Sequence, residues 1–302
     1  MKLAILFWCY KNADLCEDRV KNLRKLNPET SIYVLFGGEP SNSKKFELTL
    51  KPYIDDFFTF DETPPPSADD VQFREGAYWK YYFGDLLISS WYRNCGARLG
   101  WDTIIIVQWD MLILGSISEI FSTLQEDQIL LSGLRPVGEV EDKWVWVAPS
   151  ELQNRRIYLD FLAFVKDRYA YSQEPLGFVA IVMGLPRTFL EKFSHIQRPE
   201  LGFMEYRVPI YAQIFGTPFC TDHRFTPWWG AVEPYKKNST LRARPWPISK
   251  LTILRNLFNP KGSRVFHPYF GPTPSGLLGW GRAVLASFLR WREKKHPADM
   301  ES

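Results

Sequence analysis

A short apolar run that ends in an acid constrains the fold of this chain most. Residues 103–107 read Thr-Ile-Ile-Ile-Val and are followed by Gln108, Trp109 and Asp110. A continuous β-branched run of this length is typical of a central parallel strand that is buried on both faces. Because burying an unpaired carboxylate is costly, Asp110 is expected where the strand leaves the sheet. Ligands of open α/β sheets bind beyond the carboxyl ends of the strands, so Gln108 and Asp110 are the first candidates for a site. The alternative is that Asp110 only caps the next segment or starts a turn.

The N-terminal part of the sequence predicts a strand, a helix and a second strand. Residues 3–10 and 31–36 are apolar, and residues 14–26 have apolar positions at helical spacing, with Asp14 as a plausible N-cap. Such a unit builds a parallel sheet. Further strands are expected at 56–61, 129–134 and 177–183, and further helices at 74–99, 155–171, 186–194 and 204–215. The chain is therefore predicted to be an α/β protein with a mixed, mainly parallel central sheet flanked by helices.

Composition excludes several classes of protein. The net charge of the 302 residues is only +3, and no basic stripe with interleaved aromatic residues is present, which argues against a nucleic-acid partner. The four cysteines contain no Cys-x-x-Cys pair, which argues against a zinc site and favours a reducing, cytosolic location. No run reaches about 18 apolar residues, so no transmembrane helix is predicted. The high aromatic content, 16% with 12 Trp, suits stacking on sugar rings or a place at a membrane interface.

The order and spacing of these segments resemble the GT-A glycosyltransferases of the nucleotide-diphospho-sugar transferase superfamily. The tripeptide Gln108-Trp109-Asp110 stands where that family carries its Asp-x-Asp motif, and the helix expected at 74–95 precedes it, as in the family. His267, in the segment Arg-Val-Phe-His-Pro-Tyr-Phe, falls where many members supply a further metal contact. The resemblance covers most of the chain and implies a Rossmann-like GT-A fold with an acceptor-side subregion.

The resemblance also implies a division of the chain. Residues 1–270 would form one GT-A-like catalytic domain, with a nucleotide-sugar-binding half at 1–115 and an acceptor half at 116–270. Residues 271–302 would form a C-terminal helix and tail. In this segment the apolar residues share one helical face and the basic residues the other, so 277–295 is expected to lie on a membrane surface. A helix docked on the domain or on a partner protein would have the same pattern.

The resemblance assigns a metal site to the acid at the strand end. In the family, the second acid of the motif holds a divalent cation that neutralises the diphosphate leaving group, so Asp110 would take this metal-binding and catalytic role. His267 would be a second ligand, and an imidazole ligand favours Mn²⁺ over Mg²⁺. Gln108 replaces the first acid, and its amide suits a hydrogen bond to the ribose of the donor better than a bond to a cation. The alternative for His267 is a packed position in the core.

Three further residues are donor-binding candidates through the resemblance. Tyr10 ends the first strand, and Lys80 and Asp85 lie on the helix that borders the donor in the family. A solvated helix face is the alternative for Lys80 and Asp85.

Two features of the second half are candidates for contact with the acceptor. Glu205 opens the helix expected at 204–215 and is the candidate base that takes a proton from the acceptor hydroxyl, a role that supports inversion at the sugar carbon. Its alternative is a favourable interaction with the helix dipole. The tripeptide Trp228-Trp229-Gly230 predicts an aromatic platform for a sugar ring, or a lid, and hydrophobic packing of a long loop is the alternative.

We therefore expect a glycosyltransferase that moves a sugar from a nucleotide-diphospho-sugar to a hydroxyl group of a glycan or lipid-linked glycan. Its expected location is the cytoplasm, on the cytoplasmic face of a membrane if the C-terminal segment binds there. Two other interpretations stay open. Gln108 would also suit a catalytically degenerate scaffold of a glycan assembly system, which would bind nucleotide without transfer. A sugar-phosphate nucleotidyltransferase is disfavoured, because residues 9–13 contain no glycine for a phosphate loop.

Overall fold

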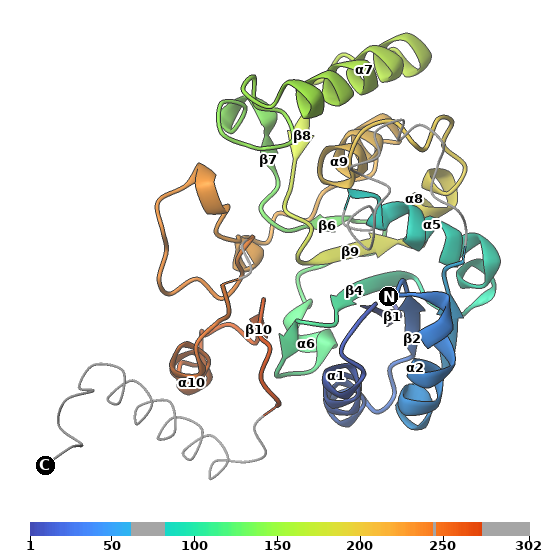
Figure 1. The fold of residues 1–302 in the computed structure, drawn as a ribbon, viewed down its shortest axis with the longest axis vertical. Helices are drawn as coiled ribbons and strands as arrows, with labels where there is room; N and C mark the ends of the chain where they lie inside the picture. The colour runs from blue at the N-terminus through green and yellow to red at the C-terminus, as the bar shows by residue number, and fades with distance from the viewer. Residues whose placement is uncertain (62–81, 244–245, 274–302) are drawn as a thin grey trace, which may run out of the picture.

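The computed structural model describes residues 1–61, 82–243 and 246–273. Its centre is a six-stranded sheet with helices on both faces (Figure 1). In spatial order the strands are β3 (Asp56–Thr59), β2 (Ile32–Phe36), β1 (Leu3–Cys9), β4 (Thr103–Gln108), β9 (Met183–Pro186) and β6 (Leu130–Leu131). The pairs from β3 to β4 are parallel, and β9 is antiparallel to both of its neighbours. The predicted α/β fold with a mainly parallel central sheet is thus confirmed.

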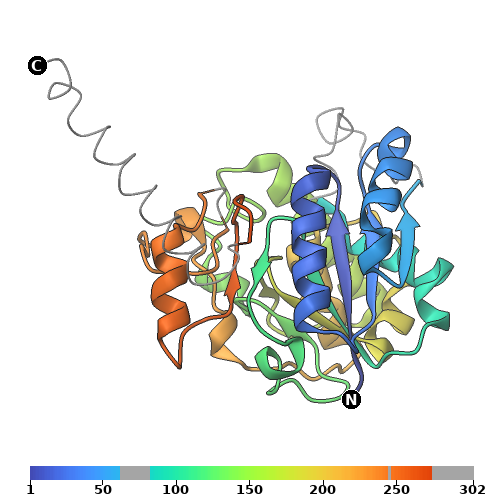
Figure 2. The same ribbon diagram turned by 90° about the horizontal axis from the view of Figure 1, so that it is seen from below.

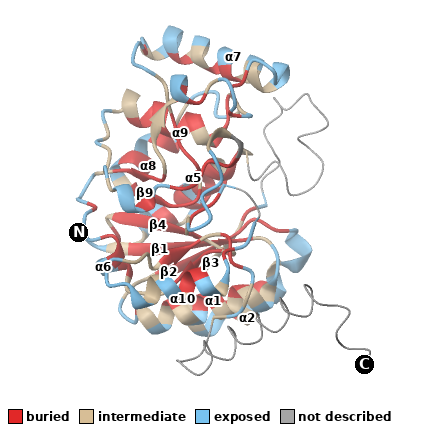
Figure 3. Ribbon diagram, turned by 90° about the vertical axis from the view of Figure 1, so that its left-hand side faces the viewer, coloured by how far each residue is buried: buried red, intermediate tan, exposed pale blue. Residues whose placement is uncertain are grey.

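The helices form a layer on each side of this sheet. One layer contains α1 (Ala13–Leu26) and α2 (Ser43–Leu50), and the other contains α5 (Gly84–Asn94), α8 (Arg187–Phe193) and α9 (Met204–Ile214), as Figure 3 shows. The short α6 (Ile117–Ile120) follows β5 (Leu112–Ile113), and the longer α7 (Leu152–Tyr169) lies outside α9. Apart from the half-buried edge strand β3, the strands between the two layers are almost entirely buried, which fits the continuous apolar runs from which they were predicted.

The C-terminal part of the described chain packs beside α1. It contains α10 (Lys250–Phe258) and β10 (Val265–Phe266), and β10 pairs antiparallel with β5 (Leu112–Ile113). Figure 2 shows this orange-to-red part at one side of the sheet. Its small apolar core, built around Leu112 and Phe266, is separate from the large core that surrounds the sheet. Since β5 follows Asp110 directly, this pairing brings the end of the chain to the end of β4.

Several predicted boundaries were wrong. The first helix begins at Ala13 after Asn12, so Asp14 lies in its first turn and is not its N-cap. The helix expected at 74–99 is observed only as α5, and residues 74–81 lie outside the described ranges. The helix expected at 186–194 is α8, which begins one residue later, so Pro186 is its N-cap residue. No helix in the described ranges is long and apolar enough to cross a membrane, and the predicted amphipathic segment 277–295 lies beyond them.

The apolar run at 177–183 is a buried loop rather than a strand. Only its ends are extended: β8 (Leu176–Gly177) pairs with β7 (Arg135–Pro136), and β9 begins at Met183. Between them the hydroxyl group of Ser132 donates to the carbonyl of Val179 and accepts from the amide of Val182. Backbone bonds from the amide of Val179 to the carbonyl of Ser132, and from the amide of Ser132 to the carbonyl of Val182, complete the anchor. Because one serine satisfies these polar groups, the loop can be buried without a partner strand.

Candidate functional site

Asp110 lies just beyond the carboxyl end of β4, as predicted, and faces His267. The distance from the Nε2 atom of His267 to the Oδ1 atom of Asp110 is 3.4 Å, and the two side chains are 13% and 14% exposed. Oδ1 is buried and has no hydrogen-bond donor among the described residues. The backbone holds the two residues together, because the amide of Tyr269 donates to the carbonyl of Asp110 over 2.8 Å. A buried carboxylate oxygen without a donor is costly, and the buried guanidinium of Arg19 is a positive group close enough to interact with Asp110.

The hydrogen bond of Nδ1 determines which nitrogen of the His267 ring carries the proton. Nδ1 lies 3.2 Å from the carbonyl oxygen of Arg242, which can only accept, so Nδ1 carries the proton. In the neutral imidazole, Nε2 then presents a lone pair towards the carboxylate oxygen of Asp110. Two electron-pair donors face each other at this point, as in a site for a proton or a metal ion. No group of three or more His, Cys, Asp or Glu side chains suited to a metal occurs within the described ranges.

Glu205 lies in the first turn of α9 and is held by two donors. Its Oε1 atom accepts from the amide of Ala180 over 2.9 Å, and its Oε2 atom accepts from the indole nitrogen of Trp146. The ring of Trp146 packs against those of Tyr82 and Phe203, so Glu205 lies beside an aromatic cluster. Burial raises the pKa of Glu205 to about 7, although both hydrogen bonds oppose the rise. A carboxylate with such a pKa can gain and lose a proton near neutral pH.

A proline inside α9 locks this acid to the loop after β8. Pro209 has no amide hydrogen, so the carbonyl of Glu205, four residues earlier, has no partner in the helix. That carbonyl accepts instead from the amide of Phe178 over 2.9 Å. The backbone and the side chain of Glu205 therefore hold the same loop, at Phe178 and at Ala180. The effect of Pro209 on this carbonyl was not predicted from the sequence.

The same loop connects Glu205 with the strand end that carries the candidate metal ligand. The side-chain amide of Gln108 donates to the backbone carbonyl of Ala180. The backbone amide of Ala180 in turn donates to the carboxylate of Glu205. Gln108 is thus part of the framework between β4 and α9, and one of its amide hydrogens is used there. Neither Ala180 nor Trp146 was a predicted site residue, and no local pattern in the sequence distinguishes them.

Tyr10 lies at the same end of the sheet as Asp110. It follows β1, whose Trp8 is in register with Gln108 in β4. The ring of Tyr10 meets that of Trp109 edge-on at 5.8 Å, and the Nζ atom of Lys11 lies 5.3 Å and 4.9 Å from these two ring centroids. A half-buried tyrosine ring and a cation therefore lie next to the candidate metal ligands. Lys80, the other basic donor-binding candidate, lies outside the described ranges.

The structure gives Asp85 a different role from the predicted donor contact. Its carboxylate is buried and bonds bidentately to Arg207, with Oδ1–Nη2 and Oδ2–Nε distances of 2.6 and 2.7 Å. Arg207 also donates to the carbonyls of Pro199, Leu201 and Gly202. Because both oxygens of Asp85 are used, this ion pair fixes α9 against α5 instead of binding a donor. Sequence reasoning missed the pair because its members are 122 residues apart.

Trp228 and Trp229 are not the exposed platform that was expected. The two side chains are only 3% and 4% exposed. Trp229 packs against Trp144 and lies under the guanidinium of Arg135, and Trp228 packs against Tyr235. The alternative, packing within a long loop, is therefore the correct interpretation for both.

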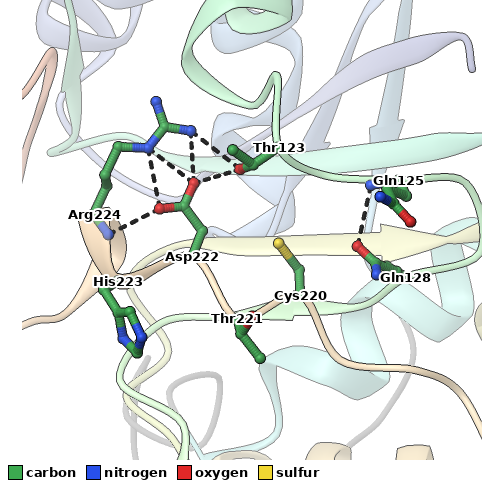
Figure 4. Close-up of a pocket in the computed structure, with 8 residues that line it drawn as sticks. All are labelled: Thr123, Gln125, Gln128, Cys220, Thr221, Asp222, His223 and Arg224. Carbon is green, nitrogen blue, oxygen red and sulfur yellow. Dashed lines mark hydrogen bonds and ion pairs between the residues drawn. The ribbon is translucent and has the colours of Figure 1, made fainter.

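A hollow of about 460 Å³ lies at the opposite end of the sheet. It is lined by residues that precede β6 and by the segment 220–224, whereas Asp110 follows the parallel strand β4. Figure 4 shows the carboxylate of Asp222 directed at Arg224 and Thr123, with His223 pointing away from it. The charges of Asp222 and Arg224 thus satisfy one another.

Solved structures that resemble this chain are glycosyltransferases. The galactosyltransferase LgtC, in complex with donor and acceptor sugar analogues, is 16% identical, with 96% of this chain and 99% of LgtC covered and a TM-score of 0.47. The glycosyltransferase GlyE of Streptococcus pneumoniae TIGR4 is 11% identical over 98% of this chain and 64% of GlyE, with a TM-score of 0.39. Mouse xyloside xylosyltransferase 1 is 13% identical over 72% of this chain and 84% of its own, with a TM-score of 0.34. No protein-family model and no curated protein matches the sequence. At these identities the likeness concerns the course of the chain, so the chemistry of the site has to come from its own side chains.

Proposed function

We propose that this protein is a glycosyltransferase that moves a sugar from a nucleotide-diphospho-sugar to a hydroxyl group of a glycan or lipid-linked glycan. The observation that carries the proposal is the pair formed by Asp110 and His267. An oxygen without a donor and an imidazole lone pair face each other at the carboxyl end of the central strand. In open α/β sheets this is the edge at which ligands bind.

The pair suits a divalent cation, and Mn²⁺ fits its mixed ligands better than Mg²⁺. Carboxylate oxygen and imidazole nitrogen are both accepted by Mn²⁺, whereas Mg²⁺ prefers oxygen alone. Asp110 and His267 would hold the ion, which when bound neutralises the negative charge of a diphosphate leaving group. Two protein ligands are enough for such an ion, because phosphate oxygens and water usually complete its shell.

Glu205 is the group that we assign to proton transfer. The acceptor oxygen forms a bond to the anomeric carbon of the sugar while the bond from that carbon to the diphosphate breaks. The electron pair leaves with the diphosphate, and the hydroxyl proton of the acceptor passes to Glu205. A base with a pKa of about 7 is well matched to this step near neutral pH. The bonds from Ala180 and Trp146 hold its two oxygens in place during the transfer.

The aromatic and basic residues beside the pair suit the nucleotide part of the donor. Tyr10 is half-buried and offers ring surface against the buried Trp109, and the exposed Lys11 adds a positive charge that favours phosphate. Gln108 contributes indirectly, because it orients the loop that holds Glu205. A lipid-linked acceptor would agree with the basic amphipathic pattern of 277–295, and we propose a cytoplasmic protein that contacts a membrane surface through that segment.

Binding of the donor can be tested by thermal stabilisation. The purified chain would be heated with UDP, GDP, CDP and their sugars, with and without Mn²⁺. A ligand at a hundredfold excess over its Kd stabilises a fold by about 2.7 kcal/mol. We expect one nucleotide to raise the Tm only with Mn²⁺, and we expect Asp110→Ala and His267→Ala to abolish the rise. His195→Ala is the matched control, because His195 is an exposed residue whose ring bonds to Glu191 and to its neighbour Ser194.

Catalysis needs a second measurement. With the stabilising nucleotide-sugar, release of free nucleotide is expected from the wild type and not from Asp110→Ala. Binding without release, even when a broad set of glycans is added, would favour the catalytically degenerate scaffold. Absence of any nucleotide effect on the Tm would refute the transferase proposal.

A further inference from the structure

Two exposed aromatic side chains lie together at the surface near the site. Tyr235 and Trp246 are 53% and 51% exposed. Their ring centroids are 5.7 Å apart with the planes at 73°, and the buried Trp228 contacts both, at 5.0 and 5.3 Å. Single exposed aromatic residues are common, but a contiguous group over a buried aromatic floor is typical of a binding surface. This pair, with its floor, is called the Tyr235–Trp246 platform below.

A buried arginine holds the platform in one conformation. Arg242 is 4% exposed, and its guanidinium lies 5.6 Å from the ring centroid of Tyr235. It donates to the backbone carbonyls of Lys237, Ser239, Trp246 and Pro247 at distances of 3.0–3.4 Å. These carbonyls belong to the two parts of the loop that carry Tyr235 and Trp246. Because one side chain holds both of these parts, a ligand that binds there loses little affinity to ordering them.

The platform is attached to the candidate metal ligand through the backbone. Residues 240–243 lie between Trp228 and His267 and bond to both. The amide of Trp228 donates to Leu241, and the amide of Arg242 donates to the carbonyl of His267, each over 2.9 Å. Two neighbouring strand spacings amount to about 10 Å, so the floor of the platform lies roughly that far from His267. A short oligosaccharide can span this distance.

We propose that the Tyr235–Trp246 platform binds a sugar ring of the acceptor glycan, at a residue other than the one that carries the reacting hydroxyl group. This inference rests on the proposed transferase function and adds a subsite to it. The platform would make the enzyme select an oligosaccharide over a single sugar, because one ring of the acceptor is held on the platform while another faces Glu205.

The chemistry of the platform favours a sugar over other ligands. One face of a pyranose ring consists largely of C–H groups, which pack on aromatic rings, and its hydroxyl groups point to the rim. The rim here is polar, since Lys236, Lys237 and Asn238 are exposed beside Tyr235. Sites for small ligands combine apolar surface with a few polar groups in this way. A protein partner would require a much larger continuous surface than two side chains provide.

The test uses the full chain, fluorescently labelled, on a printed array of oligosaccharides, with Tyr235→Ala and Trp246→Ala beside the wild type. We expect the wild type to bind a subset of glycans and each variant to bind that subset roughly two- to tenfold more weakly, the usual range for one aromatic contact. Trp246→Phe should retain most of the binding. Phe258→Ala is the matched control, because Phe258 is 70% exposed on α10 and lies outside the platform.

A kinetic measurement separates this inference from the proposed function. Hydrolysis of the nucleotide-sugar by water does not involve an acceptor, so its kcat and the KM of the donor should be unchanged in Trp246→Ala. The KM of a glycan from the bound subset should rise instead. Equal glycan binding by the wild type and both alanine variants would overturn the inference, as would a wild type that hydrolyses the donor but binds no glycan. If the wild type binds no nucleotide at all, the transferase proposal itself is overturned.

Discussion

Replacement of Glu205 by Gln should change how the stability of this protein depends on pH. Burial raises the pKa of Glu205 from its ordinary value of 4.5 to about 7, so the folded state binds this proton more tightly than the unfolded state. The contribution of this tighter proton binding to the free energy of unfolding is fully present below pH 4.5 and is lost as the pH rises through about 7. At 1.36 kcal/mol for each pH unit, the loss amounts to about 3 kcal/mol. Glutamine does not titrate and removes this dependence.

Urea unfolding followed by tryptophan fluorescence measures the effect. We expect the free energy of unfolding of the wild type, relative to that of Glu205→Gln, to fall by about 3 kcal/mol between the acidic and the mildly basic range. Glu126→Gln, a substitution at an exposed acid, should show no such change. In the wild type, sugar transfer should also accelerate as the pH rises through about 7. A difference between wild type and variant that is independent of pH would refute the assignment of this pKa.

Three further substitutions test the framework around the site. Asp85→Asn leaves the buried charge of Arg207 without its partner and should lower the free energy of unfolding by about 3–5 kcal/mol in urea titrations. Gly133→Ala should lower the Tm measurably by calorimetry, because Gly133 has a φ of +68° and a Cβ atom there would lie 2.6 Å from the nearest side-chain atom. Pro209→Ala restores an amide that competes for the carbonyl of Glu205. Hydrogen exchange in the facing loop should therefore accelerate while the helix is at least as stable. Unchanged exchange would show that the proline does not hold the loop.

The position of Asp110 could be predicted because it follows from local physics. A continuous apolar strand has to be buried on both faces, and an acid that follows it can only lie at the strand end. Its pairing with His267 is of a different kind, since the two residues are far apart in the sequence and meet only because β10 pairs with β5. Only the resemblance to a family placed them together. The pattern of residue types by itself gave no reason to connect them.

The errors have a common physical cause, which is a distant partner that local patterns do not reveal. The run at 177–183 is as apolar as a strand, but the hydroxyl group of Ser132 replaces the hydrogen bonds of a strand partner. Asp85 lies on a helix next to the site, yet a buried arginine in another helix binds its carboxylate. In both cases the sequence indicated residues with a defined role, and the fold identified the distant partner that determines this role.

The short ladder between β5 and β10 makes the candidate metal site a property of the whole chain. A polypeptide that has emerged only as far as α9 already contains Asp110, Gln108 and Glu205, but the imidazole that faces Asp110 is missing until residue 267 has been made and has returned to β5. Contacts of such large sequence separation form late, since loop closure must precede them. An ion that bridges the two residues would therefore bind only the completed fold and stabilise it by mass action. Affinity for the ion would then serve as a test of whether the C-terminal part is in its native place.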